Sequence, residues 1–249
     1  MRSIYILIIV VMLSGCNSEN AWDCIQTAGP IVEYEVEVAD FERIFVNRDV
    51  ELILSQGAEF NVTVRTGKNL VSDIDIRVSG NQLRITDNNT CNLVREYGIT
   101  QVYVTAPQLT EIRNSSQYEV SSTGVLSYDD IILTSEDFNV PGSFNVGDFR
   151  LELDCDAVQI IANGRSSYFL TGTVNNLFIG FFSGDGRFEG ESLLAEHIEV
   201  FHRGSNDMIV NPQQSLSGAL VSTGNLISVN VPPLVDVDVL YTGQLIFED

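Results

Sequence analysis

Three acidic side chains occupy alternate positions in residues 149–156, where every second residue is apolar. Glu152, Asp154 and Asp156 therefore share the solvent-facing side of one predicted strand, with neighbouring carboxylates about 6.6 Å apart. An inverting glycosidase holds its two carboxyl groups roughly 6.5–9.5 Å apart, so the spacing is compatible with glycoside hydrolysis. Asp129 and Asp130 form a further acidic pair, but no basic partner that would protonate a leaving group accompanies either set. We interpret these acids as a solvated strand face, with a polysaccharide hydrolase or lyase as the alternative.

Metal-ligating residues are sparse in this chain. The two histidines, His197 and His202, would point to opposite faces of a strand, so they do not predict a zinc site. Residues 184–190 resemble a glycine-aspartate calcium corner, but the motif occurs once and lacks a partner coil, which favours a structural turn. We predict no metal and no cofactor, with calcium binding by surface carboxylates as the open alternative.

Aromatic residues are concentrated in residues 177–201. Alternation places Phe178 and Phe182 opposite Leu177 and Phe181, so one of the two sets faces outward. Outward rings would form a stacking platform for a sugar or an apolar protein surface, whereas a bulge near Gly180 would let both sets pack in the core. The predicted ligand face lies at the exposed edge of residues 177–206 and comprises Phe178, Phe182, Phe188, His202 and Arg203.

The beginning of the chain carries a covalent modification motif. Arg2 is followed by the apolar run 4–13 and then by Leu-Ser-Gly before Cys16, which is typical of a signal peptide ending in a lipobox. The run is too short to span a bilayer as a helix, which needs about 20 residues. We expect residues 1–15 to be removed and the Cys16 thiol to be lipidated by a thioether to diacylglycerol.

Three cysteines then remain for an oxidising compartment. Cys24 and Cys91 lie in polar, loop-like stretches and are the favoured disulfide, which would stabilise the fold by roughly 4 kcal/mol on a chain-entropy basis. Cys155 falls in phase with the apolar positions of its strand, so we expect a buried free thiol.

The charge balance excludes one class of partner. The chain has 13 Lys and Arg against 34 Asp and Glu, a net charge of −21 that becomes −22 once Arg2 is removed. Such a surface repels nucleic acid and anionic lipid headgroups, so we expect no nucleic-acid binding and attachment to the membrane through the lipid on Cys16.

Short alternating strands separated by polar turns begin at Ile31, with one brief helical turn expected at residues 68–72. In the second half, turn tetrads start at residues 114, 135, 163, 183, 203 and 222, so most are separated by 19 to 21 residues. A period near twenty predicts an all-β, right-handed parallel β-helix or β-solenoid with about 20-residue coils, and a β-sandwich is the alternative. The expected divisions are a tether at 16–30, a solenoid domain at 31–249 with a strand-rich part at 31–107, a repeat part at 108–230 and a C-terminal cap at 231–249.

Several stretches resemble the head GIN domain family when they are taken in order. They are residues 41–44, 49–57, 62–64, 69–70, 80–85 and 102–109, followed by the serine- and glycine-cornered repeats, and together they span about 36–230. The resemblance implies a right-handed β-helical envelope lipoprotein described as an auto-transporter adhesin, and it brings no catalytic or binding residues. Most coils here lack the usual Ser-Gly-Ala-Ser corner.

The sequence thus predicts a non-enzymatic, lipid-anchored protein of the cell envelope that adheres to a glycan or an envelope protein. The expected location is the outer membrane, facing either the periplasm or the cell surface. The alternatives are the polysaccharide-active enzyme and a purely structural envelope protein.

Overall fold

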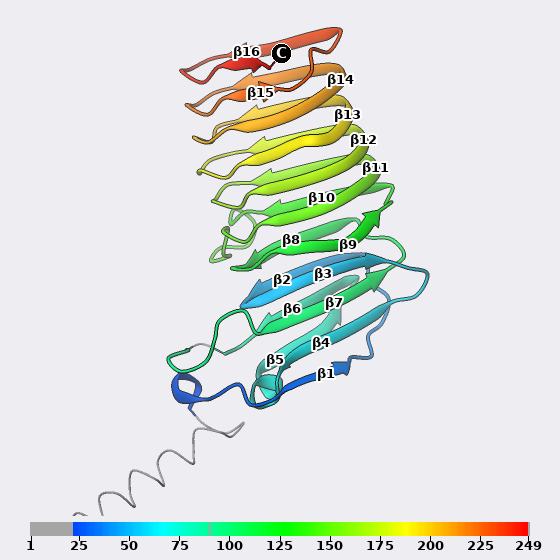
Figure 1. The fold of residues 1–249 in the computed structure, drawn as a ribbon, viewed down its shortest axis with the longest axis vertical. Coiled ribbons are helices and arrows are strands. Elements are labelled where there is room, and N and C mark those ends of the chain that lie inside the picture. Colours follow the sequence, from blue (N-terminus) through cyan, green and yellow to red (C-terminus); the bar gives the residue numbers. More distant parts are fainter. Residues whose placement is uncertain (1–21, 90, 249) are drawn as a thin grey trace, which may run out of the picture.

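The computed structural model describes residues 22–89 and 91–248, which form a long stack of strands (Figure 1). The predicted signal peptide at residues 1–15 and Cys16 lie outside the described residues. Two 3-10 turns occur in this part of the chain, η1 (Asp23–Ile25) and η2 (Lys68–Asp73), and the second coincides with the helical turn predicted at 68–72. The remaining regular structure is β-strand, which confirms the predicted all-β class. The strands are β1 (Ile31–Glu35), β2 (Arg43–Arg48), β3 (Val50–Gln56), β4 (Asn61–Gly67), β5 (Ile74–Ser79), β6 (Gln82–Asp87), β7 (Thr100–Ala106), β8 (Glu111–Ser116), β9 (Val120–Leu126), β10 (Asp130–Ser135), β11 (Phe149–Ala162), β12 (Tyr168–Phe181), β13 (Phe188–His202), β14 (Met208–Leu220), β15 (Leu226–Ser228), β16 (Leu234–Val239) and β17 (Leu245–Phe247).

The long strands β11 to β14 lie parallel and in register with one another. Phe149 pairs with Tyr168, Tyr168 with Phe188 and Phe188 with Met208, so each strand lies above the part of the chain about twenty residues earlier. In Figure 1 these strands bend at the right-hand edge, and each covers two sides of the stack. Gly172 and Gly218 adopt positive φ inside this stack, where a Cβ would meet the carbonyl oxygen of Leu153 or Val200 in the strand below. Only glycine fits these two positions.

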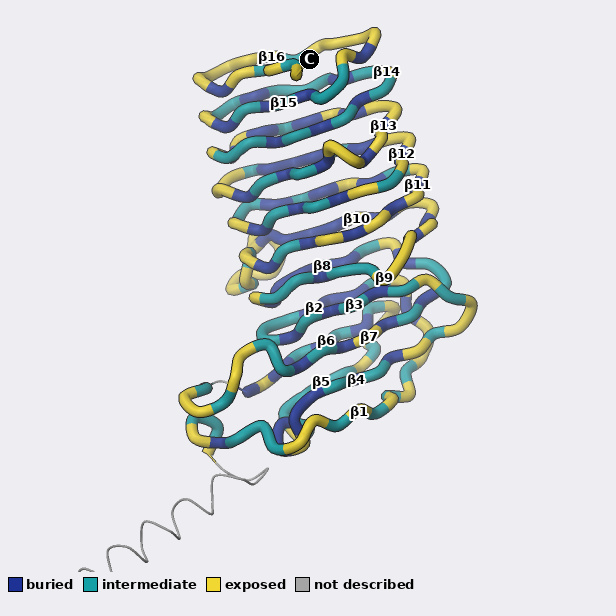
Figure 2. The backbone as a smooth tube through the Cα atoms, viewed as in Figure 1, coloured by how far each residue is buried: buried dark blue, intermediate teal, exposed yellow. Residues whose placement is uncertain are grey.

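Buried residues alternate with less buried ones along many of the strands (Figure 2). Alternate side chains therefore point inward, and apolar ladders fill the interior of the stack. One ladder consists of Phe149, Tyr168, Phe188, Met208, Leu226 and Leu245. Phe149 and Tyr168 stack with ring centroids 4.9 Å apart and an interplanar angle of 6°. We call each circuit of the chain, about twenty residues long, a rung of the stack. Contacts between equivalent positions bury each rung against the next.

The N-terminal strands are not arranged in sequence order. β2 lies between β6 and β8, and β3 pairs with β7 and β9, so strands from the predicted strand-rich part join the same parallel stack. β4 pairs antiparallel with β7 and with β1, and β5 pairs antiparallel with β6. The stack therefore ends in a short antiparallel region on the side where the described chain begins (Figure 1).

The polar turns align in a column along one edge. Asp185 N donates to Gly164 O at 3.1 Å, Ser205 N to Gly184 O at 3.0 Å and Gly224 N to Gly204 O at 3.2 Å. The regular spacing of the turn tetrads in the sequence thus corresponds to backbone hydrogen bonds between successive turns.

Candidate functional site

The outward-facing positions of β10 to β14 form a shallow groove of about 480 Å³. The register of these strands places side chains in rows across the groove. The first row consists of Ile132, Gln159, Phe178, Glu199 and Ser217. Phe178 thus has an amide on one side and a carboxylate on the other, each on a neighbouring strand about 4.8 Å away.

A second row crosses the same groove two residues earlier on each strand. It consists of Asp130, Ala157, Asn176, His197 and Ser215. His197 Nδ1 and Ser215 Oγ are 2.9 Å apart and hydrogen-bonded. The groove therefore combines one aromatic ring with exposed hydrogen-bonding groups, which is the chemistry that recognises a polar ligand with an apolar face. From here on, "the groove" means this hollow together with the two rows of side chains that cross it.

The aromatic residues beside the groove form a continuous outer patch. A Cβ on Gly180 would lie 2.9 Å from the ring of Phe178 and 2.7 Å from that of Phe182, so both rings fold over this glycine. Phe182 also packs against Phe201 at 5.3 Å and edge-on against Phe138 at 6.1 Å between ring centroids. Phe178 and Phe182 therefore lie on the outside, half-buried, and not in the core.

Two members of the predicted ligand face are not on it. Phe188 and His202 are both 0% exposed, which is a correction to the prediction. Phe188 begins β13 in the inward ladder, because the turn at 182–187 shifts the alternation of inward and outward positions. His202 pairs with the buried Phe181 and Leu220, whereas Arg203, in the following turn, is exposed.

His202 supports the turn and does not face a ligand. Gly204 N donates to its Nδ1 at 3.3 Å, so Nε2 carries the proton and donates to Asn206 O at 2.8 Å. Burial lowers the pKa of His202, because the imidazolium would lose its water shell. His197 is exposed on the opposite side of the strand, as predicted from the spacing of the two histidines.

The acidic residues lie on the outer face but do not share one cavity. Asp154 and Asp156 line a hollow of about 250 Å³ with Asp129, whereas Glu152 lies in a separate hollow beside Phe169. Thr173 Oγ1 donates to Asp154 at 2.8 Å and Asn175 Nδ2 to Asp156 at 2.7 Å, both from the next strand. The two aspartates thus help to hold the coils together.

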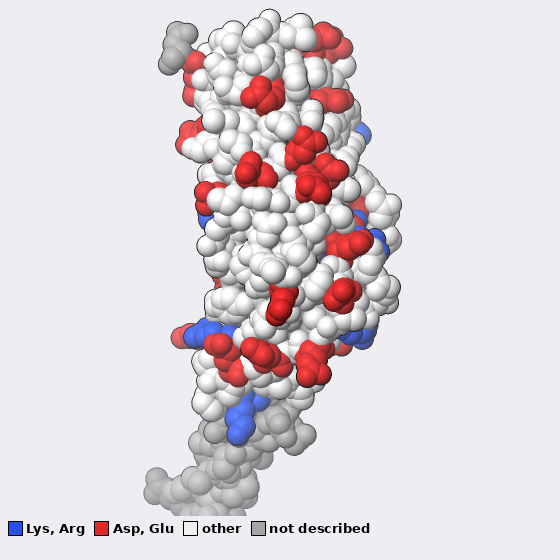
Figure 3. Space-filling view, turned by 90° about the vertical axis from the view of Figure 1, so that its right-hand side faces the viewer, with Lys and Arg blue, Asp and Glu red and all other residues white. Residues whose placement is uncertain are grey.

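Among the described residues, no group of three or more His, Cys, Asp or Glu side chains is arranged to hold a metal ion. Asp185, in the predicted turn at 184–190, pairs instead with Arg165, with Nε and Oδ1 3.4 Å apart. The face in Figure 3 carries acidic side chains along most of its length and few basic ones. In the same described part, no helix has the length and apolar character needed to cross a membrane.

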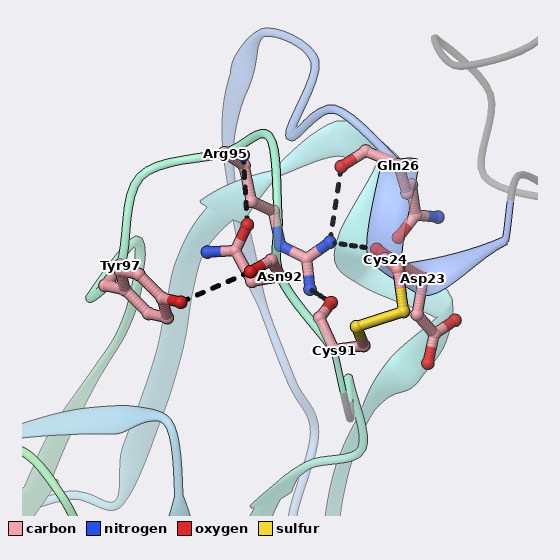
Figure 4. The surroundings of a disulfide bond; sticks show 7 residues. All are labelled: Asp23, Cys24, Gln26, Cys91, Asn92, Arg95 and Tyr97. Atoms are coloured by element: carbon pink, nitrogen blue, oxygen red, sulfur yellow. Dashed lines mark hydrogen bonds between the residues drawn. A yellow bond between two sulfur atoms is a disulfide. The ribbon is translucent and has the colours of Figure 1, made fainter.

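The cysteines occupy two different environments. Cys24 and Cys91 form a disulfide, the pairing that the sequence favoured, and Cys155 is a buried free thiol. Arg95 reinforces the disulfide, because its guanidinium donates to the carbonyl oxygens of Asp23 at 2.7 Å and Cys91 at 3.0 Å (Figure 4). Nothing in the sequence marks Arg95 for this role.

Sequence reasoning found Phe178 but missed its neighbours in the groove. Gln159, Phe178 and Glu199 pair directly across β11, β12 and β13, at a spacing close to the interval between turns. Aligning the strands by the turn tetrads would have placed Gln159 and Glu199 in one row but Ile179 between them, because Phe178 lies five residues before its tetrad and the other two lie four residues before theirs.

The chain belongs to the head GIN domain family. The sequence profile of the family, described as "Putative auto-transporter adhesin, head GIN domain", matches residues 40–232. No curated protein matches the chain.

Several solved structures have a similar fold. A "putative adhesin" from Bacteroides fragilis NCTC 9343 superposes with a TM-score of 0.80 at 18% identity, covering 89% of this chain and 99% of that one. A "putative adhesin" from Parabacteroides merdae ATCC 43184 gives 0.62 at 15% identity over 89% and 97% of the two chains. A "putative lipid binding protein" from Parabacteroides distasonis ATCC 8503 gives 0.60 at 16% identity over 88% and 97%. At these identities the likeness concerns the fold.

Proposed function

We propose that this protein is a non-enzymatic, lipid-anchored adhesion module of the cell envelope that binds a glycan through the groove. The observation that carries the proposal is the placement of Phe178 between Gln159 and Glu199, above the row that contains Asn176 and His197. A sugar ring has apolar faces and a rim of hydroxyl groups, which match one aromatic ring surrounded by amide, imidazole and carboxylate groups. The description of the family supports an adhesive role.

We further propose that the stacked rungs are a right-handed β-solenoid serving as a rigid scaffold. The parallel registers of β11 to β14 and the column of turns support this classification. A rigid rod holds the groove in its binding geometry in advance, so binding does not have to order the site.

Anchoring at Cys16 rests on the signal peptide and lipobox, which lie outside the described residues. Growth on a labelled fatty acid should label the native chain and leave Cys16→Ser unlabelled. Protease treatment of intact cells then distinguishes the two possible locations. Digestion of the protein would place it on the cell surface, and protection would place it in the periplasm.

The groove is tested by screening the purified protein against envelope and host polysaccharides. Phe178→Ala should weaken binding of a captured glycan by about tenfold or more, because truncating a central aromatic residue of a binding site typically costs about 2 kcal/mol or more. Phe169→Ala is the matched control, because Phe169 is also a half-buried outward aromatic of β12 but lies under Arg150, away from the groove. Equal losses in both variants would contradict the assignment of the groove.

Catalysis is the competing function, and the hollow shared by Asp129, Asp154 and Asp156 is the observation that favours it. Release of reducing or unsaturated sugar from any polysaccharide in the panel, abolished by Asp154→Asn, would replace the adhesion proposal with an enzymatic one.

A further inference from the structure

Five large exposed apolar side chains belong to the two segments that the Cys24–Cys91 disulfide joins, near the end of the molecule where the described chain begins. Trp22 directly precedes the η1 turn and Ile25 ends it, whereas Leu93, Val94 and Tyr97 come from the loop that precedes β7. Their exposed fractions range from 38% to 74%. We call these five residues the foot, because the two segments that carry them, η1 and the loop before β7, lie near one end of the stack (Figure 1).

The two segments of the foot are fixed against each other. The Cys24–Cys91 disulfide joins them, and Leu93 N donates to Cys24 O at 3.0 Å. Arg95 donates to carbonyl oxygens of both segments, and Tyr97 Oη donates to Asn92 O at 3.2 Å (Figure 4). The apolar side chains are therefore presented by a rigid support, which lowers the entropic cost of binding.

The composition of the foot matches one kind of partner. Trp and Tyr have apolar rings with one polar group, and they are enriched where a bilayer meets water. Ile25, Leu93 and Val94 add aliphatic surface of the kind that inserts at the boundary between headgroups and acyl chains. The net charge of −21 disfavours anionic lipid, so the matching surface is zwitterionic.

The position of the foot in the chain supports the same partner. Cys16 precedes Trp22 by six residues, a stretch that spans at most about 20 Å. A lipid on Cys16 would therefore keep the foot within that distance of the bilayer, where even weak insertion is favoured by the high local concentration.

We propose that the foot docks on the zwitterionic surface of the membrane that holds the lipid anchor, so that the stack stands on its disulfide-bonded end. This inference rests on the proposed anchoring at Cys16. Docking at this end directs the long axis away from the bilayer and leaves the groove on β10 to β14 accessible to a ligand. The lipid alone would not fix that orientation.

The test uses the native lipidated chain in phosphatidylcholine and phosphatidylethanolamine vesicles. Trp22 is the only tryptophan, so its fluorescence reports on the foot alone. Docking should shift Trp22 emission to shorter wavelength, permit quenching by brominated acyl chains and protect Trp22 from aqueous iodide.

The informative variant is Leu93→Ser with Val94→Ser, which keeps both the lipid anchor and the tryptophan. It should lower the equilibrium constant for docking by about tenfold or more, because two buried aliphatic side chains are lost. Trp22 should then become accessible to iodide while the protein still sediments with the vesicles. Phe138→Ser is the matched control, because Phe138 is 58% exposed but belongs to the side of the stack beside Phe182, and it should leave Trp22 protected.

Each outcome decides a different point. If the protein fails to sediment with vesicles and takes up no fatty acid, the anchoring proposal is wrong. If it sediments but Trp22 is fully accessible to iodide, anchoring stands and docking of the foot is overturned. Protection of Trp22 only at high protein-to-lipid ratios would make the foot an interface between copies and would also overturn the proposal, as would equal loss of protection in Phe138→Ser.

Discussion

At the scale of single residues, the ion pair between Arg113 and Glu136 joins a fully buried carboxylate to a guanidinium that is 11% exposed. Arg113 Nη1 and Glu136 Oε1 are 2.7 Å apart, and the Glu136 side chain is fully buried. Burial alone would raise the pKa of Glu136, but hydrogen bonds from Arg113 and Asn139 outweigh it and lower the pKa below 4.5. The contribution of Glu136 to stability is therefore complete above pH 4.5 and lost as the pH falls through the lowered value.

Removing one partner of this pair should cost more than removing both. Arg113→Met leaves the Glu136 carboxylate buried without its cation, so we expect a loss of about 3–5 kcal/mol in the free energy of unfolding. Arg113→Met with Glu136→Leu should recover much of that loss. Urea unfolding measures both variants, and a double variant as unstable as the single one would contradict this explanation.

His202 makes stability depend on pH in a different range. Its folded pKa is lowered from 6.5, so the neutral ring contributes fully above pH 6.5 and the contribution is lost as the pH falls through the folded value. Asp207 opposes the shift without reversing it. We expect His202→Gln to be less stable than the parent protein at pH 7.5, but to lose less stability on acidification to pH 5. Thermal unfolding across this range tests the prediction, and parallel curves for the two proteins would refute it.

At the scale of elements, the turn column depends on close packing of glycine against the preceding turn. A Cβ on Gly224 would collide with His202 Nε2 and with the carbonyl oxygen of Asn206. Gly224→Ala should therefore destabilise the protein by about 2 kcal/mol, the usual cost of overpacking. Gly124→Ala is the control, because a Cβ on Gly124 in β9 would meet no heavy atom within 4 Å and the φ of this glycine is not positive. Similar melting temperatures for the two variants would show that the column tolerates a methyl group.

The elements also explain which features the sequence could predict. Alternation and turn spacing identified the strands of the second half, because each rung contacts the rung about twenty residues away. Phe188 was misplaced because the turn at 182–187 changes the phase of alternation, which a single-strand pattern does not record. The pairing of β2 with β8 joins residues 68 positions apart, such as Arg43 with Glu111, and no local pattern encodes it. The favoured Cys24–Cys91 pairing already joined the two segments of the foot, but alternation in strands says nothing about the exposure of side chains in loops, so the foot was not identified.

At the scale of the whole molecule, the stack is a one-dimensional arrangement in which each rung is stabilised mainly by its neighbours. The Cys24–Cys91 disulfide lies at one end, and it closes a loop of 67 residues that includes β1 to β6. On a chain-entropy basis its contribution is about 4 kcal/mol. Because the intervening rungs separate it from β11 to β14, reduction should loosen the end that carries the foot and leave the groove intact.

Amide hydrogen exchange after mild reduction tests this separation directly. We expect faster exchange in β1, β4 and β5, which form the antiparallel region near the disulfide, and unchanged exchange in β12 and β13. Glycan binding through the groove should survive reduction, whereas protection of Trp22 on vesicles should be lost, since the two halves of the foot would no longer be held together. Uniform acceleration along the whole stack would mean that the molecule opens as one cooperative unit, and attachment and ligand binding would then share one folding equilibrium.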